Sequence, residues 1–187
     1  MTDVHDRRTV AATSLVVQFA LAALIVIVAP RFAVANLHVT PLWLLAGAAA
    51  GVSLYLASAR MGFPPRAAFA ARVRSLLVKS ALVAAVAWAE ETLWRGVVFG
   101  VLEPRGIALA LGLTTVCFAA AHVFGQGWAG FGSHLLTGLT FGALYLVSGS
   151  LAAAIVAHAV YNVFVVIADH GLRNLRRDEL QRMTACS

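Results

Sequence analysis

Charged residues are scarce in this sequence. Asp, Glu, Lys and Arg make up 12% of its 187 residues, against about 25% in a typical soluble domain. Hydrophobic residues reach 61%, so the composition excludes an ordinary soluble protein and indicates an integral membrane protein. The net charge of +6 does not indicate a nucleic-acid partner, because the basic residues lie in the expected loops and tails of a membrane protein.

Cysteine is also scarce, with only Cys117 and Cys186 in the chain. The two are far apart and have no partner spacing, which excludes a disulfide framework and a zinc-finger pattern. Period-2 alternation of apolar and polar residues is lacking as well, which excludes a membrane β-barrel.

Long apolar segments are abundant, and a membrane-spanning helix needs about 20 mostly apolar residues. Pro- and Gly-containing breaks separate these segments. The sequence therefore predicts an all-α, polytopic transmembrane helix bundle with about six spans. The predicted spans are residues 9–30, 39–59, 77–101, 106–124, 129–147 and 149–169.

The first apolar run is longer than the hydrophobic region of a signal peptide, which has about 7–15 residues, so we expect an uncleaved span. Basic residues set the orientation of the bundle. With the N-terminus inside, the outer loops hold only Arg31 and Arg105 of the 14 Lys and Arg residues, and Arg95 lies within a helix. Both termini are therefore predicted to be cytoplasmic, and the tail bearing Arg173–Arg182 anchors the inner side.

The third predicted span carries charge in the stretch AWAEETLWRG. A charge near a bilayer centre costs at least roughly 2.5–3.5 kcal/mol, so Glu90, Glu91 and Arg95 need a reason to be there. Glu91 and Arg95 are four residues apart on a helix, with the acid first, and this order favours an ion pair. Glu90 points about 100° away from Glu91 and has no local partner, so it is a candidate for chemistry.

Other polar residues interrupt the later spans. His122 follows Phe118 by one helical turn, and His158 precedes Asn162 by one turn, so each pair shares a helix face. Asn162 could hold the imidazole of His158 or donate to a bound group, and Phe118 could form a wall of the site. His134 lies near a helix start, where an interfacial or hydrogen-bonding role is expected.

A carboxylate and two imidazoles around one cavity suit the activation of water. Glu90 can act as a general base, and His and Asn can donate hydrogen bonds to a tetrahedral oxyanion. The same groups could bind zinc, because two histidines and one glutamate form a known catalytic set. The sequence has no HExxH motif, so the common helical zinc signature is absent.

Three motifs resemble one known family. EETLWR (Glu90–Arg95) is similar to its EExxxR motif, FAAAH (Phe118–His122) to its FxxxH motif, and HAVYN (His158–Asn162) to its HxxxN motif. They occur in the order found in the CAAX protease and bacteriocin-processing family, also called Abi proteins or type II CAAX prenyl endopeptidases. The resemblance covers residues 85–169, a four-helix catalytic core, between an N-terminal two-span region with a basic loop (1–84) and a basic tail (170–187).

The resemblance implies a glutamate-dependent intramembrane endopeptidase, although the family is often labelled metalloprotease. Glu90 would be the general base, His122 would orient the water, and His158 with Asn162 would form the oxyanion site. Glu91, Arg95 and Phe118 would support them. The expected substrate is a membrane-associated peptide or protein, such as a peptide leader, a bacteriocin precursor or a C-terminal anchor, in the lipid bilayer of a bacterial-type plasma membrane.

Two other function classes remain open at this stage. Ionisable residues inside membrane helices also mark the pathways of proton- or ion-coupled transporters. A non-catalytic immunity or scaffold protein could retain the same fold. The sequence shows no inverted repeat and keeps the full set of motif residues, and both features favour the peptidase.

Overall fold

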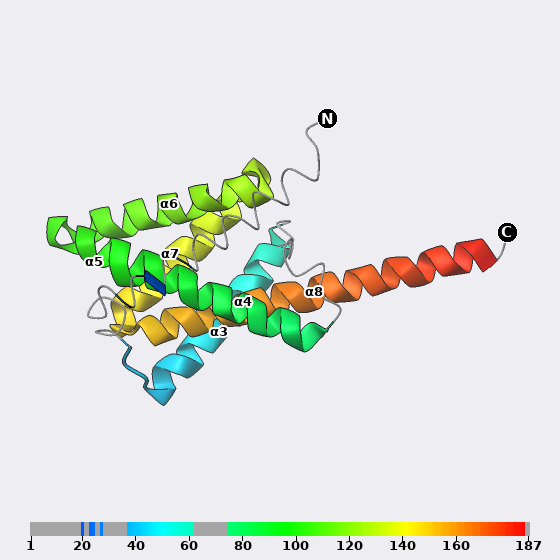
Figure 1. Cartoon of the computed structure of the whole chain (residues 1–187), viewed down its shortest axis with the longest axis horizontal. Coiled ribbons are helices and arrows are strands. Elements are labelled where there is room, and N and C mark those ends of the chain that lie inside the picture. The colour runs from blue at the N-terminus through cyan, green and yellow to red at the C-terminus, as the bar shows by residue number, and fades with distance from the viewer. Residues whose placement is uncertain (1–19, 21–22, 25–26, 28–36, 62–74, 186–187) are drawn as a thin grey trace.

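The computed structural model describes residues 20, 23–24, 27, 37–61 and 75–185, with side chains to residue 171 except for 125 and 126. Its regular elements are helical throughout these ranges, as Figure 1 shows. Most of the predicted first span (9–30) and most of the basic segment after residue 60 lie outside the described residues. The α-helices are α3 (Pro41–Arg60), α4 (Leu76–Glu91), α5 (Phe99–Leu102), α6 (Ile107–Gln126), α7 (Phe131–Ser148) and α8 (Leu151–Ala185).

The helix boundaries follow local chemistry. Pro41 opens α3, where its missing N–H costs no hydrogen bond, and the Ser75 hydroxyl accepts a hydrogen bond from the Val78 N–H to cap α4. Gly106 (φ 128°) and Gly149 (φ 60°) form the turns before α6 and α8, in backbone conformations that favour glycine. Two of the Pro- and Gly-containing breaks predicted between spans, EPRG (103–106) and SGS (148–150), are therefore confirmed.

The third predicted span is helical throughout, but the type of helix changes along it. After Glu91 the chain forms a seven-residue π-helix, η2 (Thr92–Val98), and then returns to α-helix in α5. The path ends in a 3₁₀ turn, η3 (Glu103–Arg105). π-Helical segments are rare and often lie at functional sites, so this change of winding marks the region of Glu90, Glu91 and Arg95.

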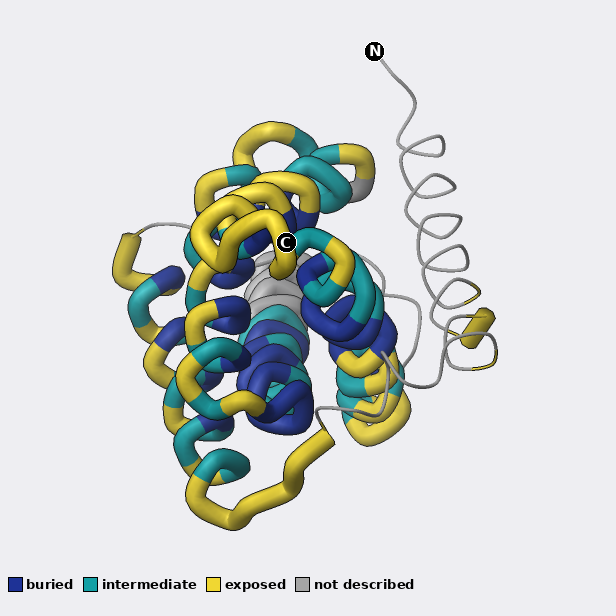
Figure 2. The backbone as a smooth tube through the Cα atoms, turned by 90° about the vertical axis from the view of Figure 1, so that its left-hand side faces the viewer, coloured by how far each residue is buried: buried dark blue, intermediate teal, exposed yellow. Residues whose placement is uncertain are grey.

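Helix α8 is the element that connects the bundle. It packs against α3, α4 and α7, while α6 packs against α7. In Figure 2 the buried residues line the inner faces of the helices, and the exposed residues lie outside. Close contact between α3 and α8 depends on glycine, because a Cβ added at Gly47 would lie 2.6 Å from the carbonyl oxygen of Ala153.

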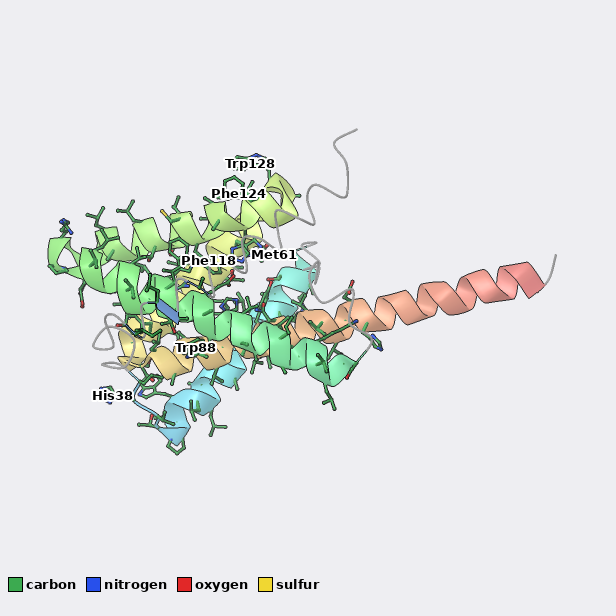
Figure 3. All side chains as sticks on the ribbon, viewed as in Figure 1. His38, Met61, Trp88, Phe118, Phe124 and Trp128 are labelled. Atoms are coloured by element: carbon green, nitrogen blue, oxygen red, sulfur yellow. The ribbon has the colours of Figure 1, made fainter. Side chains whose placement is uncertain are left out.

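The outer surface of the bundle is apolar, as a lipid-facing surface must be. Figure 3 shows Phe124 and Trp128 on the outside of the bundle, whereas Phe118 lies within it. Trp128 belongs to η4 (Trp128–Gly130), the 3₁₀ turn that connects α6 to α7. Among the described residues, four helical segments are long and apolar enough to cross a membrane: Pro41–Arg60, Ile107–Phe124, Trp128–Ser148 and Leu151–Gly171.

Candidate active site

Two adjacent glutamates close α4, and an arginine follows one turn later in η2. All three are buried, with exposed fractions of 3% for Glu90 and 0% for Glu91 and Arg95. The expected ion pair forms, because Nη1 of Arg95 donates to Oε1 of Glu91 at 3.0 Å. A second guanidinium nitrogen, Nη2, donates to the carbonyl oxygen of Gly138 at 2.6 Å and so ties this pair to α7.

Aromatic rings surround the guanidinium of Arg95. Its Cζ atom lies 4.9 Å from the ring centroid of Phe118 and 6.0 Å from that of Phe141. The negative face of an aromatic ring attracts a cation, and the attraction grows when the cation is removed from water. Arg95 is therefore stabilised by a carboxylate, a carbonyl and two rings, which explains how an arginine is accommodated inside the bundle.

His158 lies between the two glutamates. Its Nδ1 atom is 2.8 Å from Oε1 of Glu91, and its Nε2 atom is 3.6 Å from Oε2 of Glu90. A carboxylate paired with arginine accepts hydrogen bonds, so the proton of the neutral imidazole is on Nδ1. The lone pair of Nε2 then faces Glu90. Glu91, and not Asn162, is therefore the residue that forms the hydrogen bond orienting the His158 imidazole.

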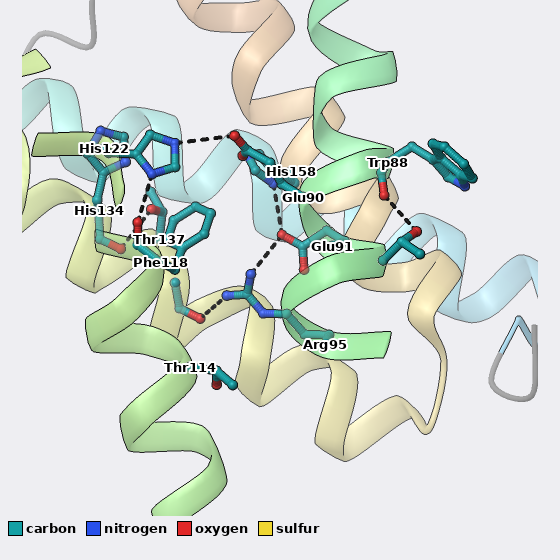
Figure 4. Close-up of polar contacts among 12 residues, drawn as sticks. Trp88, Glu90, Glu91, Arg95, Thr114, Phe118, His122, His134, Thr137 and His158 are labelled. Carbon is teal, nitrogen blue, oxygen red and sulfur yellow. Dashed lines mark hydrogen bonds and ion pairs between the residues drawn. The ribbon is translucent and has the colours of Figure 1, made fainter. Parts of the chain in front are cut away.

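His122 approaches Glu90 from α6 in the same manner. Its Nδ1 atom donates a 2.8 Å hydrogen bond to the carbonyl oxygen of Phe118, because a carbonyl can only accept. Its Nε2 atom lies 3.6 Å from Oε1 of Glu90. Figure 4 shows the two imidazoles converging on the Glu90 carboxylate from different helices.

The two 3.6 Å separations are longer than hydrogen bonds of about 2.7–3.2 Å. The carboxylate and the two Nε2 atoms thus face one another without bonding directly. No Lys or Arg among the described residues forms an ion pair with Glu90, whereas Glu91 is neutralised by Arg95. The arrangement provides a buried proton acceptor beside two further nitrogen acceptors.

The donor types also suit a divalent metal. Metal-binding histidines usually donate their other ring N–H to a carboxylate or a backbone carbonyl, as His158 and His122 do here. However, no group of three or more His, Cys, Asp or Glu side chains in the described part of the chain is arranged so that it could hold a metal ion. By their chemistry alone, these donors suit a metal.

Comparison with known proteins identifies the family of this chain. Residues 72–164 match the Rce1-like type II CAAX prenyl endopeptidase family. The chain belongs to this family. It is therefore a CAAX-type intramembrane protease, and the substrates of such proteases are membrane-associated proteins. The matched range includes every residue of the three sequence motifs. No curated protein and no solved structure matches the sequence.

The structure of this CAAX-type protease brings most of the predicted site residues into one cluster. Phe118 is buried, with its ring centroid 4.5 Å from that of His122 and 5.8 Å from that of His158. Asn162 lies one turn beyond His158 on α8 and is half-buried. Among the described residues, no hydrogen bond joins Asn162 to the other members of the cluster.

Sequence reasoning assigned no place in the site to α7. Its His134 ring nevertheless stacks on His122, with centroids 4.0 Å apart and planes 23° apart. Its Phe141 ring stacks on His158, with centroids 4.6 Å apart and planes 21° apart. His134 and Phe141 are seven residues apart and so lie two turns apart on one helix face, and this spacing is the only signal of the relationship in the sequence.

Proposed function

We propose that this protein is an intramembrane endopeptidase that uses Glu90 to activate water for hydrolysis of a peptide bond in a membrane-associated protein or peptide. The observation that carries this proposal is the convergence of two Nε2 atoms on the Glu90 carboxylate at 3.6 Å each. In the neutral form neither imidazole can donate a proton toward Glu90, because the Nδ1 contacts place the single ring proton on Nδ1.

A water molecule among these three acceptors would donate its protons to two of them. Glu90 is the carboxylate of the three, and no Lys or Arg among the described residues forms an ion pair with it, so we assign it the role of general base. Transfer of a proton from water to Glu90 leaves hydroxide to attack the scissile carbonyl. The protonated Glu90 can then return the proton to the amide nitrogen as the C–N bond breaks, and the products are a carboxylic acid and a free amine.

We assign the stabilisation of the oxyanion to Asn162 and His158. Asn162 lies on the same face of α8 as His158, one turn further along, and its amide provides two N–H donors. Donors placed where negative charge develops stabilise the tetrahedral intermediate. Asn162 donates in its resting state, whereas His158 donates from Nε2 only in its imidazolium form, with a second ring proton taken up from solvent.

The decisive experiment is cleavage of a membrane-peptide library by purified protein in detergent or liposomes. Glu90→Gln is compared with the wild type and with Glu103→Gln, which changes an exposed glutamate in η3. We expect cleavage by the wild type and by Glu103→Gln, and a loss of at least about 10²-fold in Glu90→Gln. Cleavage that persists in Glu90→Gln would contradict the proposed role of Glu90.

Each protein is also assayed with and without a strong chelator. Cleavage that ignores the chelator supports a glutamate mechanism without metal. Loss on chelation and recovery with zinc would instead make Glu90, His122 and His158 candidate metal ligands. If neither protein cleaves any peptide, proton flux in liposomes tests the transporter alternative directly.

We further propose that both termini lie in the cytoplasm. The basic residues after α3 and in the C-terminal tail are then inside, which agrees with the positive-inside rule. Reporter fusions to each terminus and to the Glu103–Arg105 turn test this orientation. We expect cytoplasmic signals from both ends and an external signal from the turn, and the reverse pattern would overturn the assignment.

A further inference from the structure

Helix α7 carries no residue of the three motifs, yet it touches both histidines that face Glu90. His134 lies against the face of His122, and Phe141 lies against the face of His158. The interplanar angles of 23° and 21° are nearly equal, so both contacts are close to parallel stacking. One helix thus supplies a flat ring to an imidazole from α6 and to another from α8.

The same face of α7 is fixed to the site by a third contact. Between the two rings lies Gly138, whose carbonyl oxygen accepts the 2.6 Å hydrogen bond from Nη2 of Arg95. A Cβ added at Gly138 would lie 3.0 Å from Cδ1 of Phe118, so α7 and α6 approach closely here. The bond to Arg95 and the close packing on Phe118 therefore fix α7 at Gly138, between the two rings that contact the histidines.

A single hydrogen bond does not fix an imidazole. The bonds from Nδ1 to Glu91 and to the Phe118 carbonyl define one direction for each ring, but rotation about that direction would still swing Nε2 away from Glu90. A ring stacked against the imidazole face blocks this rotation. The hydrogen bond and the stacked ring together direct Nε2 toward the carboxylate.

We propose that His134 and Phe141 are positioning residues that hold His122 and His158 with their Nε2 atoms directed at Glu90. The assignment deepens the proposed function and rests on it. Neither residue is required to exchange a proton or to touch the substrate. What each supplies is a flat, nearly parallel surface, so a phenyl ring can replace the imidazole at position 134.

The test compares two variants at position 134. His134→Phe keeps an aromatic ring, whereas His134→Leu has a side chain of similar volume without a ring. We expect His134→Leu to lower kcat by about 10- to 100-fold, because small misplacements of reacting groups cost rates of this order. KM and the melting temperature should change little, and His134→Phe should recover most of kcat. Leu139→Ala, an exposed change on α7, is the matched control and should resemble the wild type.

Phe141→Leu provides the second arm, at the other histidine. We expect a similar loss of kcat, with substrate affinity unchanged when it is measured in a Glu90→Gln background that does not turn over. Equal activity of His134→Leu and the wild type would overturn the assignment for His134. An impairment of His134→Phe as severe as that of His134→Leu would show that stacking is not the relevant property.

A readout that needs no cleavage separates this proposal from the proposed function. Side-chain nitrogen NMR of histidine-labelled protein reports the surroundings of each ring nitrogen. We expect one sharp Nε2 resonance for His122 in the wild type and in His134→Phe, and a shifted or broadened one in His134→Leu, because the imidazole can then rotate about its Nδ1–H bond. An unchanged Nε2 resonance in His134→Leu contradicts the positioning role, even if Glu90→Gln has already ruled out the peptidase mechanism.

Discussion

Oxygen Oε1 of Glu91 accepts a 2.8 Å hydrogen bond from Nδ1 of His158, across 67 residues of sequence. The same oxygen accepts the 3.0 Å bond from Arg95. One carboxylate atom thus orients an imidazole of α8 and neutralises a buried guanidinium of η2. This shared role makes Glu91 the residue on which both the shape and the charge balance of the cluster depend.

We therefore expect Glu91→Gln to be strongly destabilising. Removing one partner of a buried ion pair leaves the other charge uncompensated, at a cost of about 3–5 kcal/mol. Thermal unfolding in detergent, with Glu103→Gln as the control, measures the loss. Adding Arg95→Met to Glu91→Gln should restore much of the stability, since the buried charge is then removed. A double variant as unstable as Glu91→Gln alone would argue against the ion pair as the cause.

Glu90→Gln should behave in the opposite way. Glu90 is buried and no Lys or Arg side chain in the described ranges forms an ion pair with it, so its burial is unfavourable to folding. Replacing it by a neutral amide of the same shape should leave the melting temperature unchanged or raise it. Replacing a functional group that is unfavourable to folding commonly raises stability while it lowers activity. A marked fall in melting temperature would indicate a structural role.

Asn162 provides a test of the oxyanion assignment. Asn162→Ala should lower kcat by about 10²–10³-fold, because the loss of one oxyanion donor typically has this effect. The melting temperature should change little, since no hydrogen bond joins Asn162 to the other site residues among those described. Ile167→Ala, an exposed change on the same helix, is the control. Wild-type kcat in Asn162→Ala would remove Asn162 from the mechanism.

Close packing of α3 on α8 predicts a stability effect away from the site. A Cβ at Gly51 would meet the carbonyl oxygen of Ala157 and would lie 3.0 Å from Cβ of Val160. Gly51→Val should therefore lower the free energy of unfolding by about 1–3 kcal/mol. Gly112→Ala on α6 is the matched control, because nothing lies within 4 Å of its added Cβ. Equal melting temperatures for the two variants would contradict the packing argument.

Much of the helical bundle could be predicted from the sequence. Apolar length and the Pro and Gly breaks predicted the bounds of the described spans to within a few residues, except that α8 continues to Ala185, well past the predicted end at residue 169. The Glu91–Arg95 pair was also predictable, because it depends only on local helical spacing. The π-helix was not, since a change from i→i+4 to i→i+5 hydrogen bonds leaves no apolar periodicity of its own.

The contacts that organise the site were less accessible to sequence reasoning. Phe118 was expected beside His122, and the two rings are in contact. The stacking of His134 and Phe141 and the bond from Glu91 to His158 join different helices. Such pairings depend on how the helices pack, and spacing within one helix cannot reveal them. Asn162 was considered as a partner for the His158 imidazole because only local partners were visible.

Helix α8 continues without interruption from Leu151 to Ala185, over 35 residues. At about 1.5 Å per residue it is roughly 50 Å long, well beyond a hydrocarbon core of about 30 Å. Figure 1 shows its C-terminal part projecting from the bundle. The projecting end and His158 therefore belong to one continuous helix. A displacement of that end would move the His158 imidazole as well, because no break in the helix separates them.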